Sequence, residues 1–110
     1  MLSKISNLMV SHEILLKNFK TIDLKIFTRS HAYSAYFGVD LSGFNTLIFM
    51  REASSRFIMR DSEFLLNLTE QICANLGKTI KKRVLFHNSQ ICSKSKKFLE
   101  ENGFKTYAFM

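Results

Sequence analysis

The last third of the chain has the pattern that most constrains the fold. Residues 83–86 form an apolar run typical of a β-strand, and residues 91–102 have the apolar repeat of a helix, with Ser89 as its expected N-cap. Gly103 should end that helix, because glycine readily takes the left-handed conformation found there, and a further strand follows. A strand, a helix and a strand in this order predict a right-handed parallel crossover on one sheet.

The first two thirds of the chain predict the remaining elements. Apolar positions in residues 1–20 favour one helix or two short ones. Four later segments alternate or run apolar as strands do, namely residues 22–26, 33–39, 46–51 and 56–60. A helix capped by Asp61 or Ser62 and ended by Gly77 comes next. We therefore predict an α/β fold (α+β with a mixed sheet): an N-terminal helix, four mostly antiparallel strands, a helix and a C-terminal β-α-β crossover.

Length and composition predict one self-supporting domain, residues 1–110. Its hydrophobic content of 46%, with eleven Phe, is enough for a core without disulfide or metal supports. The two cysteines and three histidines lack the spacing of a zinc site, so we expect no metal and no cofactor. The N-terminus lacks the uninterrupted apolar core of a signal peptide, and no run approaches the length of a membrane span. These features predict a cytoplasmic protein.

The basic charge is concentrated in the same last third. From Lys78 onward there are eight basic residues and two glutamates, which give +6 of the chain's formal net charge of +7. Such asymmetry indicates an acidic partner, of which nucleic acid is the commonest. A solvated lysine face and a compositional bias are the alternative explanations.

The order of charges on the last predicted helix also favours an anion. Lys94, Lys96 and Lys97 come early in the helix, whereas Glu100 and Glu101 come late. Acidic residues normally stabilise the start of a helix, where partial positive charge collects. The reversed order adds to that positive field, and a helix start of this kind can bind a phosphate.

One resemblance is carried by the order of the early elements. A helix, three strands, a helix and a strand resemble the core of restriction-endonuclease-like nucleases. The resemblance implies an acidic residue around the second strand and an acid-x-Lys triplet on the third, which hold a metal ion and orient water. Asp40 stands near the first position, but Glu52 is followed by Ala53 and Ser54, without a lysine. The missing triplet argues against a metal nuclease of this type.

A second resemblance concerns residues 84–95, which are similar to the strand-loop-helix unit of glutaredoxins and arsenate-reductase-like proteins. It implies a reactive Cys92 near a helix start, where neighbouring lysines would lower the thiol pKa. Apart from this resemblance, His87 at the end of the predicted strand could act as a proton shuttle or a phosphate contact. Those families place the unit first and use a later cis-proline, whereas here it comes last and the chain has no proline. A buried structural cysteine and a structural histidine are the competing interpretations.

Aromatic residues of the middle strands invite a third interpretation. Tyr33, Tyr36, Phe37 and Phe44 could stack on nucleobases, as aromatic residues do on the sheets of RNA-binding folds. Phe-rich strands ordinarily form core instead. An aromatic sheet edge could also pair with another chain.

Taken together, the sequence favours a small basic α/β domain without enzymatic activity that binds a phosphate-rich partner, above all nucleic acid. The predicted contact residues are Lys81, Lys82, Arg83, Asn88, Ser89, Lys94, Lys96 and Lys97. Phosphate contacts should make this binding tolerant of sequence and sensitive to salt. The alternatives are a Cys92-dependent thiol redox or transfer enzyme and a protein–protein interaction subunit, either as a homo-oligomer or with a protein partner.

Overall fold

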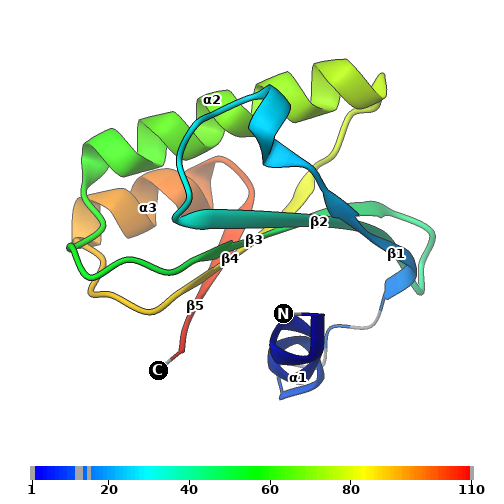
Figure 1. The fold of residues 1–110 in the computed structure, drawn as a ribbon, viewed down its shortest axis with the longest axis horizontal. Helices are drawn as coiled ribbons and strands as arrows, with labels where there is room; N and C mark the ends of the chain where they lie inside the picture. Colours follow the sequence, from blue (N-terminus) through cyan, green and yellow to red (C-terminus); the bar gives the residue numbers. More distant parts are fainter. Residues whose placement is uncertain (1, 12–13, 15, 110) are drawn as a thin grey trace.

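A five-stranded mixed sheet organises the chain, and helices lie on both of its faces (Figure 1). The computed structural model describes residues 2–11, 14 and 16–109. The strands are β1 (Leu16–Ile22), β2 (Tyr33–Asp40), β3 (Asn45–Arg51), β4 (Lys82–His87) and β5 (Phe104–Ala108). Helix α1 (Leu2–Ser11) lies on one face, and α2 (Met59–Leu76) and α3 (Ser93–Glu101) lie on the other. None of these described helices combines the length and apolar character that a membrane span needs.

The strands are hydrogen-bonded in their chain order, β1-β2-β3-β4-β5. β1, β2 and β3 are antiparallel neighbours, whereas β3, β4 and β5 run parallel. The predicted fold class and the C-terminal β-α-β crossover are therefore confirmed. Because β3 and β4 are parallel, their carboxyl ends meet, and Arg51 pairs with His87 there.

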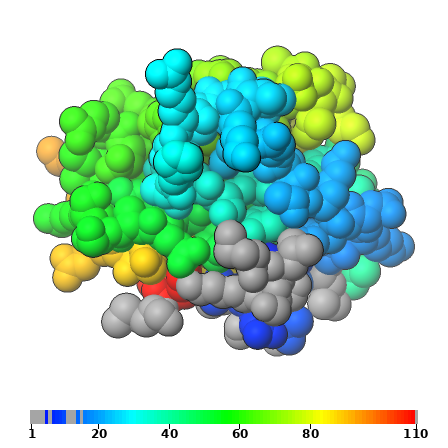
Figure 2. Space-filling view, viewed as in Figure 1, coloured from blue at the N-terminus to red at the C-terminus, as the bar shows by residue number. Residues whose placement is uncertain are grey.

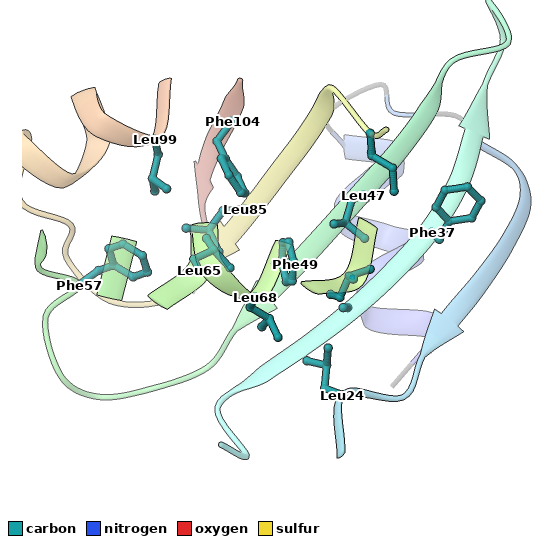
Figure 3. Packing of buried hydrophobic residues seen from close by; sticks show 13 residues of the cluster. Leu24, Phe37, Leu47, Phe49, Phe57, Leu65, Leu68, Leu85, Leu99 and Phe104 are labelled. Carbon is teal, nitrogen blue, oxygen red and sulfur yellow. The ribbon is translucent and has the colours of Figure 1, made fainter. Parts of the chain in front are cut away.

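The larger core fills the space between the sheet and helices α2 and α3 (Figure 3). Leu47 and Phe49 of β3 point into it, while Ile48 and Met50 point to the α1 face, and all four are buried. The continuous apolar run of β3 is thus explained by cover on both faces, as its sequence predicts. The residues that α2 and α3 add to the core are Leu65, Leu68, Ile72 and Leu99.

The smaller core lies under α1 on the other face. Ile5 and Met9 of α1 pack with Ile48, Met50 and Phe86 of the central strands. α1 has ten residues, a length of about 15 Å.

The N-terminal third differs from the prediction. The predicted helix of residues 1–20 ends at Ser11, and Leu16–Ile22 is an edge strand. The strand predicted for residues 22–26 is wrong, because Leu24–Ile26 is a 3₁₀ helix. The Asp23 carboxylate accepts the N–H of Lys25 at 3.0 Å, a local bond that favours a turn over a strand. Leu24 packs in the core on the α2 side of the sheet, and Figure 2 shows the light-blue segment around it at the molecular surface.

Three further local predictions are corrected. Residues 56–60 are not a strand: only Phe57 forms a β-bridge, to Ile91, and α2 begins at Met59. The Asp61 carboxylate accepts the N–H of Ile58 at 2.9 Å, so the acid sits inside the first turn of α2 and not before it. Ser89 does not cap α3, because Cys92 occupies the N-cap position. The two glycine stops are confirmed, with Gly77 at φ +65° and Gly103 at φ +84°.

Candidate nucleic-acid interface

The structure divides the predicted contact residues into two groups. Lys81, Lys82 and Arg83 lie where β4 begins, whereas Asn88 and Ser89 follow its end. The six residues of β4 separate the two positions by about 20 Å. The three lysines of α3 belong to the second group, because α3 starts beyond the end of β4.

The first group lines a cleft of about 420 Å³ at the start of β4 and β5, on the α1 face. We call it the basic cleft. Its basic residues are Lys81, Lys82, Arg83 and Lys105, and its apolar wall includes Ile14, Leu16, Leu41, Val84 and Tyr107. Lys105 is not in the predicted set. The strand pattern could have indicated it, because Lys105 and Tyr107 are two residues apart and so lie on the face opposite to Phe104. The pairing of β5 with β4 sets Lys105 beside Val84.

The carboxylate that lines the basic cleft belongs to Asp40. One of its oxygens, Oδ1, accepts the N–H groups of Ser42 and Phe44 at 3.0 and 2.8 Å. The other, Oδ2, accepts a hydrogen bond from the Lys82 ammonium, and the two groups form an ion pair. The Lys82 bond, followed by the Phe44 N–H, holds the pKa of Asp40 below its ordinary value. Lys82 is therefore partly neutralised at rest.

Arg83 has a structural role. Its Nε donates to the Ile80 carbonyl at 2.9 Å, its Nη1 donates to the Asn102 carbonyl at 3.0 Å, and its guanidinium lies 5.8 Å from the ring centroid of Phe104. These contacts tie the start of β4 to the end of α3. Lys81 and Lys105 remain as exposed cations that have no ion-pair partner among the residues that the structure describes.

The second group is less basic and partly structural. Asn88 Oδ1 accepts the N–H of Ala53 at 3.0 Å, and Ser89 Oγ accepts a hydrogen bond from Arg51 at 2.8 Å. On α3 the exposed Lys96 and Lys97 are each followed four residues later by a glutamate. Three lysines thus face two glutamates on α3, whereas the three lysines of the basic cleft face one carboxylate. The positive charge is more concentrated in the cleft.

At the opposite end of the sheet, a buried arginine joins two loops. Arg51 is only 4% exposed, and its guanidinium donates to the Ser55 carbonyl at 3.2 Å, to Ser55 Oγ at 3.3 Å and to Ser89 Oγ at 2.8 Å. It also lies 5.0 Å from the ring centroid of Phe57. We call these contacts the Arg51 network. They hold the β3–α2 loop against the β4–α3 loop.

His87 and Tyr33 flank the Arg51 network. His87 is buried, and its Nδ1 lies 2.8 Å from the Ser89 carbonyl. Because a carbonyl can only accept, Nδ1 carries the ring proton of a neutral His87. Burial raises the pKa of Tyr33 to about 12, against the opposing effect of the Arg51 charge. The hydroxyl of Tyr33 is therefore neutral at physiological pH.

The carboxylates do not fit the metal that the nuclease resemblance implies. Asp40 ends β2 beside the start of β3, whereas Glu52 follows the end of β3, about 26 Å away along the strand. β3 contains no acidic residue, and the chain's acid-x-Lys triplet, Asp23-Leu24-Lys25, lies in the 3₁₀ helix. Over residues 2–11, 14 and 16–109, no three His, Cys, Asp or Glu side chains come together as metal ligands would. Asp40 and Glu52 cannot share one ion.

Cys92 lies at the start of α3, half-buried. Its Sγ is 2.8 Å from Ser95 Oγ and accepts the N–H of Ser95 at 3.4 Å. These two bonds, the side-chain one first, lower the pKa of the Cys92 thiol. The charge of Arg56 and the backbone N–H of Lys94 lower this pKa further, so the basic side chain that contributes is an arginine outside α3 and not one of the lysines that the sequence suggests.

Replacing Ser95 by alanine should therefore slow the alkylation of Cys92. Loss of the hydroxyl removes the hydrogen bond to sulfur that lowers the thiol pKa most. The pKa therefore rises, and the thiolate fraction at pH 7 falls. We expect a severalfold lower rate with iodoacetamide, measured against pH in a Cys73→Ser background so that only Cys92 reacts. If the pH–rate profile equals that of the Cys73→Ser parent, which keeps Ser95, the hydrogen bonds of Ser95 do not set the thiol pKa.

Comparison with known proteins supplies the fold relationship. No protein-family model matches the chain, and a search of curated proteins finds no match. Among solved structures, EndoMS in apo form is 19% identical, with a TM-score of 0.58, and the match covers 97% of this chain and 45% of that one. EndoMS in complex with double-stranded DNA is 15% identical, with a TM-score of 0.54 and coverages of 97% and 43%.

A repair endonuclease from Pyrococcus abyssi is also similar. It is 15% identical, with a TM-score of 0.57, and the match covers 99% of this chain and 46% of that one. This chain thus spans under half the length of the proteins it resembles. At these identities the likeness shows the fold.

Proposed function

We propose that this chain is a nucleic-acid-binding domain that holds the phosphate backbone in the basic cleft and does not cleave it. The observation that carries the proposal is the placement of charge. Three lysines line one cleft that contains a single carboxylate, and two of them, Lys81 and Lys105, are exposed without an ion-pair partner in the described part of the chain. Phosphate groups are the ligands that such ammonium clusters attract.

The fold likeness supports nucleic acid over other polyanions. One of the similar structures is EndoMS bound to double-stranded DNA. Contacts from lysine ammonium groups to phosphates carry no sequence information, so binding by the cleft should tolerate any sequence. Lys94, Lys96 and Lys97 of α3, with Asn88 and Ser89, are assigned a secondary contribution, since two glutamates share their helix.

The proposed absence of cleavage rests on the separation of the carboxylates. Asp40 is engaged by Lys82 in the basic cleft, and Glu52 lies at the other end of β3. The Arg51 network occupies the end of β3, so a positive side chain stands there. A cation at that position opposes the binding of a metal ion nearby.

A titration with labelled oligonucleotides over a range of salt concentrations tests the proposal. Three lysines that each neutralise one phosphate predict a slope of about −2.7 for log affinity against log salt on duplex DNA. Absence of binding at low salt would contradict nucleic-acid recognition. The same mixtures incubated with Mg²⁺ or Mn²⁺ should keep intact strands on a denaturing gel. Metal-dependent cleavage by the purified chain would contradict the non-catalytic part of the proposal.

A further inference from the structure

The tip of the β2–β3 hairpin carries two exposed apolar side chains beside the basic cleft. Leu41 is 66% exposed and Phe44 is 59% exposed, and the turn lies between β2 and β3 in Figure 1. Leu41 lines the cleft, and the Lys82 ammonium lies 5.1 Å from the ring centroid of Phe44. The apolar tip and the charged cleft therefore form one continuous surface.

The tip is held in a fixed conformation. Asp40 accepts the N–H groups of Ser42 and Phe44, the Asp40 N–H donates to the Phe44 carbonyl at 2.9 Å, and the Gly43 N–H donates to the Asp40 carbonyl at 3.0 Å. Gly43 takes φ +87°, which suits glycine. A ligand that uses Phe44 thus meets a preorganised backbone, which lowers the entropic cost of binding.

The Phe44 ring is not needed by either core. The other middle-strand aromatics are accounted for: Tyr36 and Phe37 are buried in the two cores, and Tyr33 packs on Phe64 with ring centroids 5.4 Å apart. Phe44 belongs to neither cluster. Its neighbour is a lysine that is itself 53% exposed, so the ring has an ammonium over one face and open surface beyond.

We propose that Phe44 is a base-stacking platform for single-stranded nucleic acid, and this inference rests on the proposed function. An unpaired nucleobase stacks on the Phe44 ring, while Lys81, Lys82 and Lys105 hold the neighbouring phosphates in the basic cleft. Aromatic rings and a basic groove in combination are the features by which proteins bind single strands. A base inside a duplex is already stacked on its neighbours, so the platform gives a preference for unpaired strands.

The test compares Phe44→Ala with wild type on a single-stranded oligonucleotide and on its duplex. Loss of one base–aromatic stack should weaken single-strand binding by about 5- to 160-fold. Duplex affinity and the dependence on salt should stay the same, because the lysines are unchanged. A 2-aminopurine base in the single strand should be quenched on binding to wild type and not to Phe44→Ala. Phe44→Trp should retain both the affinity and the quenching.

Phe64→Ala is the matched control. Phe64 is also a partly exposed Phe, but it lies on α2, which covers the face of the sheet opposite to the basic cleft. Its affinity should equal that of wild type. If Phe44→Ala binds both substrates as wild type does, or weakens both equally, the platform is wrong while the proposed function stands. If wild type binds neither substrate, both are wrong. A dimer of the free protein that is lost in Phe44→Ala would overturn the inference by assigning the ring to self-association.

Discussion

Replacing Lys81 and Lys105 together by glutamate should reduce the affinity for nucleic acid by about 100-fold at moderate salt. Both ammonium groups are exposed, line the basic cleft and lack an ion-pair partner in the part of the chain that is described. Charge-assisted contacts contribute about 1.5–3 kcal/mol each, so loss of two accounts for about 100-fold or more. On duplex DNA, the slope of log affinity against log salt, measured by anisotropy, should also become less negative by about 1.8 units, because each lost phosphate contact removes about 0.9.

A control with the same change in charge separates the cleft from net charge. Lys96→Glu with Lys97→Glu alters the chain's formal charge equally but lies on α3, where Glu100 and Glu101 already weaken the local field. We expect a loss of less than about threefold, as screened charges remote from a site produce. Equal losses in the two double variants would contradict the cleft and leave net charge as the cause. Both double variants should unfold at the wild-type temperature, because the four replaced lysine side chains are all exposed.

Arg51→Ala should lower the free energy of unfolding by about 3 kcal/mol. The substitution removes two hydrogen bonds to Ser55 in the β3–α2 loop and one to Ser89 in the β4–α3 loop. It also removes the guanidinium from the ring of Phe57. It also leaves a space at a position that is only 4% exposed. Urea unfolding followed by circular dichroism measures the change. Such a loss is a large part of the 5–15 kcal/mol that is typical of a domain.

Arg51→Met shows which part of the side chain matters. Methionine keeps an apolar contact with Phe57 and removes the cost of a buried charge, so the loss should be about 1 kcal/mol. Wild-type stability in Arg51→Ala would show that the network does not hold the loops. Nucleic-acid affinity should change little in either variant under folding conditions, because Arg51 and Lys82 lie at opposite ends of the paired strands β3 and β4.

Elements with an uninterrupted pattern could be predicted from the sequence, and β1 shows why others could not. The continuous apolar run of β3 and the glycine-ended helices α2 and α3 were predicted correctly in kind. In β1, the half-buried residues are Leu16, Phe19 and Ile22, a spacing of three that imitates a helix. Leu16 and Phe19 pack on the same face because a bulge lies between Lys17 and Lys20, where Asn18 takes φ +53°, whereas Ile22 packs on the other face. A bulge shifts the alternation of a strand and is not visible in a hydrophobic pattern.

The candidate site was predictable in its charge and not in its arrangement. Counting residues finds the basic last third of the chain, but sheet pairing decides which cations converge. β5 brings Lys105 to the cleft, and the hairpin brings Asp40 to Lys82 across 42 positions of sequence. The local sequence of α3 looks like the stronger anion site, yet its glutamates lie one turn from Lys96 and Lys97. Long-range contacts of this kind leave no short-range signal.

The most direct test of the central claim is lysine protection in the complex. The chain is acetylated briefly with and without a saturating single-stranded oligonucleotide, and each lysine is quantified by mass spectrometry. Binding through the basic cleft predicts that acetylation of Lys81 and Lys105 falls by about fivefold or more, while Lys94, Lys96 and Lys97 change by less than about twofold. Protection of the α3 lysines with Lys81 and Lys105 unchanged would contradict the account and place the nucleic acid on α3.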